Sequence, residues 1–271
     1  MLIFVKIYKM EFLGYFFALL IGLILGIIGG GGSILGVPVF VYLFKMDAIS
    51  ATTLSLFVVG VVSAFGAIGN ARHGNVDFKT ALVFGIPSVF SIIFVRKIIL
   101  PHLPENLINI GEIHIQKNVF ILVMFAFLML LSSIKMIIGN SNIETRNSSP
   151  QYPLLITQGL AVGMITGMIG AGGGFLIVPA LVMLLNLEMK KAIGTSLFII
   201  SINSLLGFVS SENISSINWE FLSIFTFISI IGLIIGIRIS RKIDGKKLKP
   251  AFGWFVLAMG IYIIIKEVFF H

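Results

Sequence analysis

The chain has 271 residues, of which 58% are hydrophobic and only 11% charged, and its formal net charge is +8. A soluble domain carries about a quarter charged residues, so this composition predicts a membrane protein with several spans. The basic residues gather at the ends of apolar segments and form no stripe with aromatic residues, which argues against a nucleic-acid partner. The absence of cysteine excludes disulfides, iron–sulfur clusters and thiolate metal sites.

Five apolar segments follow one another in the first half of the chain. A transmembrane helix needs about 20 apolar residues, and one of these segments is shorter than that. They are Phe12–Ile28, the short Ser33–Phe44, Ala51–Asn70, Phe78–Val95 and Val119–Ile138. Lys6 and Lys9 precede the first segment as in a secretory signal, but no cleavage site with small residues follows, so we expect a retained helix. A wetter loop is expected from Arg96 to Lys117.

The second half repeats this order after a polar linker at residues 140–153. The linker separates a first membrane repeat (1–139) from a second (154–271). The apolar segments of the second repeat are Leu154–Ile169, Phe175–Leu187, Ala192–Ser210, Trp219–Ile239 and Ala251–Phe270.

A glycine motif occurs once in each repeat. GLILGIIGGGGSILGVP begins at Gly22, and GMITGMIGAGGGFLIVP begins 141 positions later at Gly163. The Gly-x-x-x-Gly spacing alone is typical of close helix packing. Consecutive glycines instead weaken a helix by roughly 1 kcal/mol each, and a break at membrane depth is tolerated only where the backbone lines a cavity or meets a ligand. Paired breaks in corresponding positions indicate the binding site of a transporter.

The number of segments also predicts a topology. Five crossings per repeat is an odd number, so the two repeats would insert with opposite orientation, as inverted repeats do. With ten crossings, seven of the 19 Lys and Arg residues fall on the side of the N-terminus, namely Lys6, Lys9, Lys45, Arg96, Lys97, Lys117 and Lys266. The other twelve fall on the opposite side, and the positive-inside rule then puts both termini outside.

The predicted helix breaks suit an anion. Ser33 and Phe175 open the short helices, so free N–H groups and the positive end of each helix dipole point into the gap. No fixed cation is required, and the apolar segments offer almost none. The predicted site combines both glycine clusters with polar residues of the helices that follow: Gly29, Gly30, Gly31, Gly32, Ser33, Ser55, Gly170, Gly172, Gly173, Gly174, Thr195, Ser196 and Asn203.

Several of these side chains also have a structural interpretation. Serine and threonine hydroxyls in membrane helices often bond to the carbonyl one turn earlier, and this alternative stays open for Thr52, Thr53, Ser55, Thr195 and Ser196. Asn203 is expected at the site or in a contact between helices. Arg72 and His73 fit either a solvated turn or a gate near the anion path. No metalloprotease, P-loop or nucleophile-elbow motif occurs, so we expect no enzyme, no metal and no cofactor.

The two glycine motifs, together with Ala192-Ile193-Gly194-Thr195-Ser196-Leu197 after the second, resemble the TauE/SafE family of sulfite exporters. The resemblance covers nearly the whole chain, although the first repeat has Ala51-Thr52-Thr53-Leu54-Ser55-Leu56 and lacks the Gly-Thr-Ser order. It implies transport of small anions, often sulfur-bearing ones such as sulfite or sulfonates.

Together these observations predict an all-α polytopic membrane protein of two homologous, inverted repeats with glycine-broken helices. Its predicted function is that of an inner-membrane permease, a secondary transporter whose partners are a small anion and the lipid bilayer. Homo-oligomerisation is left open. The alternatives are a passive anion channel and a non-transporting membrane assembly factor.

Overall fold

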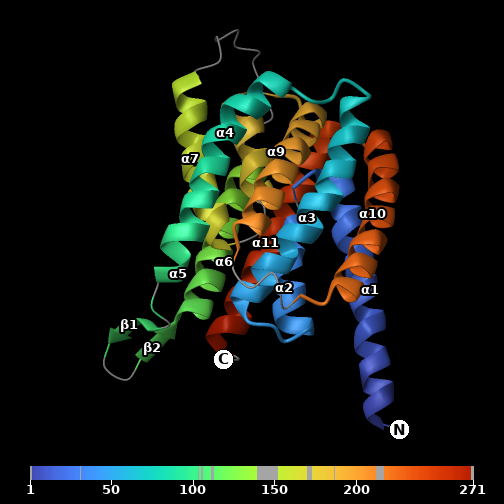
Figure 1. The fold of residues 1–271 in the computed structure, drawn as a ribbon. Helices are drawn as coiled ribbons and strands as arrows, with labels where there is room; N and C mark the ends of the chain where they lie inside the picture. The colour runs from blue at the N-terminus through green and yellow to red at the C-terminus, as the bar shows by residue number, and fades with distance from the viewer. Residues whose placement is uncertain are drawn as a thin grey trace.

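The computed structural model describes residues 2–30, 32–102, 104, 106–110, 113–138, 152–169, 173–185, 187–211 and 217–269. These residues form a bundle of helices, as the composition predicts (Figure 1). The first repeat contains α1 (Leu2–Ile28), α2 (Gly32–Pro38) continued by the π-helix η1 (Val39–Leu43), α3 (Ala48–Ala71), α4 (Phe78–Phe94) continued by η2 (Val95–Ile99) and α5 (Leu100–His102), and α6 (Lys117–Ile138). The second contains α7 (Tyr152–Ile169), α8 (Gly174–Leu184), α9 (Met189–Val209), α10 (Trp219–Lys242) and α11 (Gly245–Phe269).

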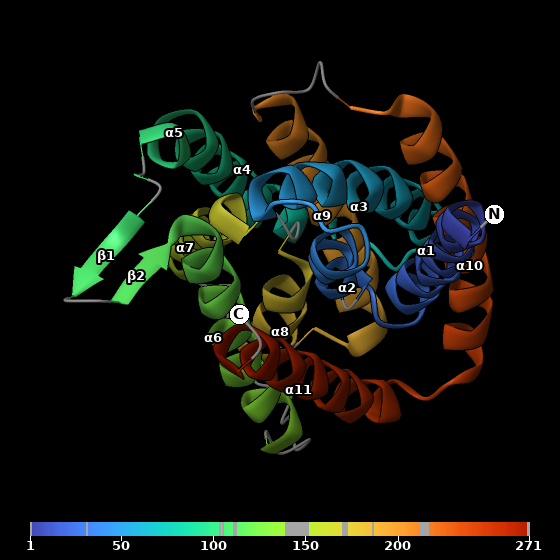
Figure 2. The ribbon, with the colours of Figure 1, turned by 90° about the horizontal axis from the view of Figure 1, so that it is seen from below.

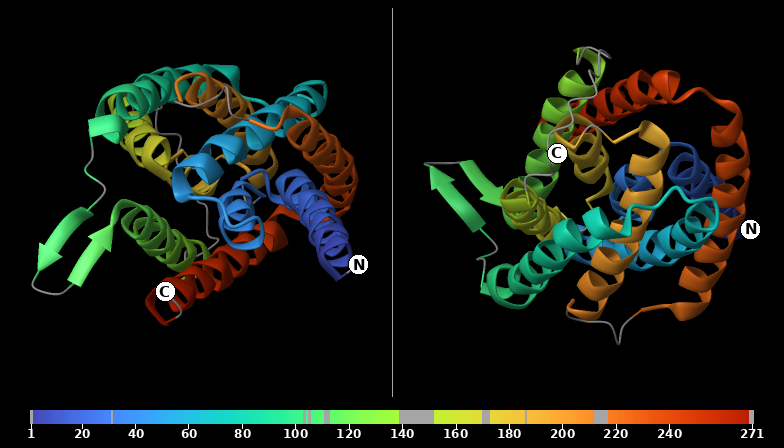
Figure 3. Two further views of the ribbon diagram at one scale, coloured as in Figure 1. Left: turned by 60° about the horizontal axis from the view of Figure 1, so that its bottom comes forward. Right: turned by 90° about the horizontal axis from the view of Figure 1, so that it is seen from above.

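One element was not expected. Strands β1 (Asn106–Ile110) and β2 (Ile113–Gln116) pair antiparallel and project to the side of the bundle (Figures 2 and 3). The expected loop from Arg96 to Lys117 was therefore wrong in its first part, because the helix continues through Arg96 to His102 before the hairpin begins. The apolar residues Ile98, Ile99 and Leu100 extend the segment past Arg96 and Lys97.

Fewer candidate crossings are found than the ten expected. Among the described residues, six helices are long and apolar enough to cross a membrane: Ala48–Ala71, Phe78–His102, Val119–Ile138, Met189–Val209, Trp219–Lys242 and Pro250–Glu267. Three further apolar helices are shorter, and one of them, α2 with η1, runs back along α1 to form a hairpin. A Cβ on Gly32 would meet Leu25 of α1, and a Cβ on Gly14, near the start of the apolar part of α1, would meet the ring of Phe44 just after η1. Each repeat thus has one hairpin and three long helices, which is still an odd number of crossings.

The glycine spacing serves helix packing, and it joins the two repeats. Gly22 of α1 lies against Ser229 of α10, and its counterpart Gly163 of α7 lies against Ser88 of α4. Ser88 and Ser229 are themselves 141 positions apart, so the same contact is made twice with the repeats exchanged. A glycine lets two helix backbones approach to this distance because it has no Cβ. The two repeats therefore interleave, and the packing interpretation of Gly-x-x-x-Gly is confirmed.

Counterpart helices pack on one another with opposite directions. Gly66 near the end of α3 lies against Leu197 near the start of α9, and Gly207 near the end of α9 lies against Leu56 of α3. Helices α6 and α11 form a second antiparallel pair. The start of α1 and the end of α11 lie at the same end of the bundle (Figure 1). In both of these pairs, a helix therefore runs opposite to its counterpart in the other repeat.

This packing predicts a large effect for one small substitution. A Cβ on Gly163 would overlap the backbone carbonyl of Ser88, so we expect Gly163→Ala to lower the free energy of unfolding by about 1–3 kcal/mol. Gly85→Ala is the matched control, because its Cβ would meet only Ile199 carbons at 4.0 Å, and we expect a change below about 1 kcal/mol. Thermal unfolding in detergent measures both. Equal melting temperatures for the two variants would contradict the packing.

Candidate functional site

The glycine clusters form the tips of the two hairpins. Gly29 ends α1 with φ of 81°, and Gly173 precedes α8 with φ of 75°. A residue with a Cβ rarely adopts this left-handed conformation, so glycine is required where the chain reverses. The hydroxyl of Ser33 donates to the carbonyl oxygen of Gly30 at 2.7 Å and closes the first tip. Three predicted site residues, Gly31, Gly170 and Gly172, lie outside the described residues.

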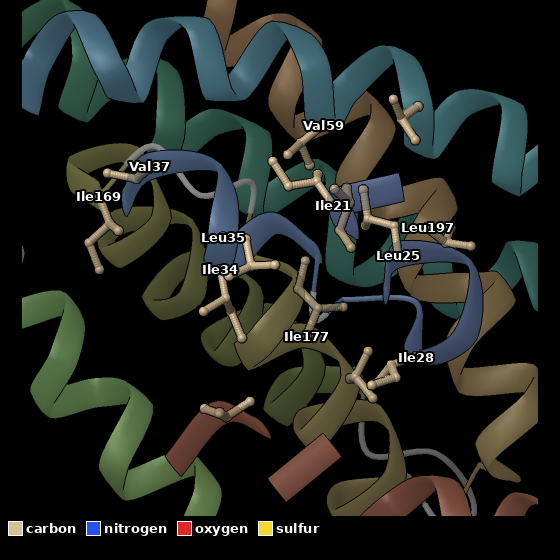
Figure 4. Close-up of a cluster of buried hydrophobic side chains, with 14 of the residues drawn as sticks. Ile21, Leu25, Ile28, Ile34, Leu35, Val37, Val59, Ile169, Ile177 and Leu197 are labelled. Carbon is tan, nitrogen blue, oxygen red and sulfur yellow. The ribbon is translucent and has the colours of Figure 1, made fainter. Parts of the chain in front are cut away.

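The two tips meet inside the bundle, between the longer helices (Figure 2). A Cβ on Gly174 would lie 2.7 Å from the Cα of Gly30 and 2.8 Å from its carbonyl oxygen. Figure 4 shows buried apolar side chains of the two short helices, with Ile34 and Leu35 of α2 near Ile177 of α8. Because all seven residues of α2 are buried, its start lies in a dry environment. The starts of both short helices are thus brought together, as the sequence predicts.

The polar side chains predicted for the site fall into two groups. In the first group, polar atoms are buried without a partner: within the described part of the chain, the hydroxyl of Ser55 makes no hydrogen bond and Oδ1 of Asn203 accepts none. Ser55 lies against Gly36 of α2, and Nδ2 of Asn203 donates to the hydroxyl of Ser88 at 2.7 Å. Asn203 therefore makes the expected contact between helices. Its unpaired Oδ1 can only accept a hydrogen bond, so the second N–H of Nδ2 is the group that can donate to an anion.

In the second group, the hydroxyl is engaged by the backbone. Ser196 donates to the carbonyl of Ile193 at 2.8 Å, which is the local bond that competes with a ligand role. The hydroxyl of Thr195 accepts from the backbone N–H of Asp77 at 2.9 Å and fixes the turn before α4. Thr52 and Thr53 both donate to the carbonyl of Ile49.

Sequence reasoning missed Arg96. Its side chain is 2% exposed, although it was expected in a loop, and so the apolar segments do contain a fixed cation. Nε donates to the carbonyl of Gly167 at 3.1 Å, at the end of α7. The two terminal nitrogens donate to three hydroxyls, those of Ser211 at 2.7 Å, Thr52 at 3.2 Å and Thr53 at 3.4 Å. None of these four hydrogen-bond acceptors carries a charge. The positive charge of Arg96 lies close to the second hairpin, because Gly167 is near the end of α7.

Arg72 and His73 are exposed in the turn after α3, which fits the solvated-turn interpretation. Nδ1 of His73 lies 2.8 Å from the carbonyl of Gly69 and 3.4 Å from a terminal nitrogen of Arg241 on α10. The turn therefore belongs to a basic surface at this end of the bundle.

Two interleaved repeats, with broken helices that meet at the centre of a membrane bundle, define a membrane transporter. The chain belongs to the family described as sulfite exporter TauE/SafE, whose profile matches residues 15–263. It is a membrane transporter of that family, and transporters are not enzymes.

Similar curated proteins carry the same general description. A "Probable membrane transporter protein" of Xylella fastidiosa (strain Temecula1) is 28% identical over 253 residues, which cover 90% of this chain and 91% of the relative. The "Probable membrane transporter protein YunE" of Bacillus subtilis (strain 168) is 26% identical and covers 93% of this chain and 96% of the relative. None of these names specifies a substrate. No solved structure gives a significant match.

Proposed function

We propose that this chain is a secondary transporter for a small anion, and that the anion binds beside the tips of the two hairpins, where their backbones meet. The observation that carries the proposal is the buried contact between Gly30 and Gly174, which brings together the starts of two broken helices. The first N–H groups of a helix have no partner within it, and the helix dipole makes this end positive. The family description favours a sulfur-containing oxyanion such as sulfite or an organosulfonate.

The expected affinity is modest. Each helix end contributes typically 0.3–1 kcal/mol when exposed and up to about 2 kcal/mol when partly buried. Hydrogen bonds donated by the hydroxyl of Ser55 and by the second N–H of Asn203 Nδ2 would add roughly 1 kcal/mol each. Arg96 supports the same preference for an anion, because its charge lies at Gly167, three residues before the second glycine cluster. A carrier must release its substrate, so weak binding fits the function.

A ligand screen tests the binding site. We expect sulfite, thiosulfate or a sulfonate to raise the melting temperature of the purified protein, since a ligand at about 100 times its Kd stabilises by about 2.7 kcal/mol. Asn203→Ala should raise the Kd of the stabilising ligand by about tenfold, which corresponds to ~1.4 kcal/mol of binding free energy. Ser201→Ala is the matched control on the same helix, because that hydroxyl bonds to the carbonyl of Phe198. If the ligand raises the melting temperature of Asn203→Ala as much as that of the native protein, Asn203 does not bind the ligand.

A labelling experiment tests the proposed inversion of the repeats in the bilayer. Lys79 of α4 and Glu220 of α10 are exposed and 141 positions apart, and the chain has no cysteine of its own. In an inverted arrangement, thiols introduced by Lys79→Cys and Glu220→Cys react with a membrane-impermeant reagent from opposite sides. Lys97→Cys is the control, and it should react from the same side as Glu220→Cys. Reaction of Lys79→Cys and Glu220→Cys from one side would mean that the duplication is parallel.

A further inference from the structure

The repeat makes two positions of the structure equivalent, yet one holds an arginine side chain and the other is a pocket. The filled position is the Arg96 cluster, defined as Arg96, Thr52, Thr53, Gly167 and Ser211. The open position is the basic pocket, lined by Gly26, Asn70, Asn75, Lys190, Ile193, Ile237, Ser240 and Arg241.

The equivalence holds residue by residue. An offset of 141 pairs Gly167 with Gly26, Ser211 with Asn70, Thr52 with Ile193, and Arg96 itself with Ile237. All four of these counterparts line the basic pocket. The arrangement of helices around the two positions is therefore the same, and the side chain at position 96 or 237 makes the difference. The long guanidinium of Arg96 reaches its acceptors on α7, on α3 and at the end of α9, whereas Ile237 cannot.

The two positions lie at opposite ends of the bundle. The basic pocket includes the end of α3 and the start of α9, and the Arg96 cluster includes the start of α3 and the end of α9. Helices α3 and α9 run antiparallel, so these are the two faces of the protein. The face with the pocket is the one richer in Lys and Arg, which the positive-inside rule puts on the cytoplasmic side.

The chemistry of the basic pocket suits a small anion. Lys190 and Arg241 are exposed at its edge, and no residue of its lining carries a carboxylate. Its cavity volume of about 30 Å³ is room for about two water molecules or a few heavy atoms. A mouth with charges of one sign raises the local concentration of an oppositely charged substrate.

We propose that the basic pocket is the open mouth of the anion path and that the Arg96 cluster is its closed mouth on the opposite face. The inference rests on the transport function proposed above, because a mouth presupposes a path. The structure then represents the state open toward the Lys- and Arg-rich face. In the opposite state, Arg96 releases its acceptors on α7 and α3 and the basic pocket contracts.

Thiol accessibility tests this inference without any substrate. The matched reporters are Ile193→Cys in the pocket and Thr52→Cys in the Arg96 cluster, each as the single cysteine of the protein in lipid nanodiscs. With Arg96 present, a charged methanethiosulfonate reagent should react with the thiol at position 193 at least about tenfold faster than with the thiol at position 52. Equal rates, or a faster reaction at position 52, would overturn the inference, and this comparison needs no change at Arg96.

Exchanging the side chains at positions 96 and 237 gives a more stringent version of the thiol-accessibility experiment. In the double variant Arg96→Ile with Ile237→Arg, the ratio of the labelling rate at position 193 to that at position 52 should fall below one. Lys97→Ala, which removes the neighbouring exposed charge, should leave the ratio unchanged. A ratio that stays the same in a folded exchange variant would show that Arg96 does not close the path. Since labelling is independent of transport, a failure here differs from a failure of the proposed function, which would appear as the absence of flux.

Discussion

Transport should be abolished by Gly30→Ala or Gly174→Ala. Each added Cβ would meet the backbone of the opposite hairpin tip, and a backbone cannot rotate away as a flexible side chain can. The two tips would be pushed apart by a few tenths of an ångström or more. Because the proposed site consists of these tips, misplaced N–H groups would no longer converge on one anion. Flux into proteoliposomes at matched protein density measures the effect.

Two control variants distinguish damage to the binding site from a general loss of stability. Gly85→Ala adds a Cβ that would meet only Ile199 carbons at 4.0 Å, an ordinary van der Waals contact, and should transport at the native rate. Gly163→Ala should lower the melting temperature through helix packing and still transport below that temperature. Native flux from Gly30→Ala and Gly174→Ala would show that the hairpin tips do not bind the substrate.

Loss of the Arg96 side chain should convert coupled exchange into leak. Arg96→Ala removes hydrogen bonds from a charged donor to three structural elements, and such bonds contribute about 1.5–3 kcal/mol each. The closed mouth then has no side chain that ties α7 to α3. We expect net anion efflux without a counter-substrate, together with a lower melting temperature. The measurement is the ratio of exchange to net efflux in preloaded proteoliposomes.

Arg96→Lys is the informative companion variant. A lysine keeps the charge but cannot reproduce the planar fork that reaches several acceptors at once, so it should leak as well, though less than Arg96→Ala. Lys97→Ala should exchange normally, because Lys97 is exposed. Normal exchange by a folded Arg96→Ala variant would mean that Arg96 only caps the end of α7.

Local chemistry made much of the fold predictable. Consecutive glycines break a helix wherever they occur, so the hairpin tips at Gly29 and Gly173 follow from the sequence alone. The spacing of Gly22 and Gly26 predicts a close helix contact for the same reason. The internal repeat then implies that every contact of one half recurs in the other, which the pairs Gly22–Ser229 and Gly163–Ser88 illustrate.

Long-range geometry could not be predicted in this way. Arg96 follows an apolar segment and precedes Lys97, a pattern that looks like the end of a span, and only the tertiary structure shows that hydroxyls of α3 surround it. The hydropathy of α1 and α2 does not show that the two helices meet in a tip inside the bundle, so more crossings were expected than the six candidate spans of the described residues. The hydroxyl of Thr195 meets the backbone of Asp77, 118 positions earlier in the chain, and no local pattern reveals that bond.

The proposed function of this protein is that of a carrier for a small sulfur-containing anion. Counterflow tests it most directly: proteoliposomes are loaded with unlabelled sulfite, and uptake of radiolabelled sulfite from a dilute external solution is followed, with thiosulfate, sulfonates and carboxylates as alternative substrates. A carrier should show transient, saturable accumulation of at least one sulfur oxyanion that depends on the internal load. Conduction of these anions without counterflow would identify a channel, and the absence of both for every anion would contradict transport of this substrate class.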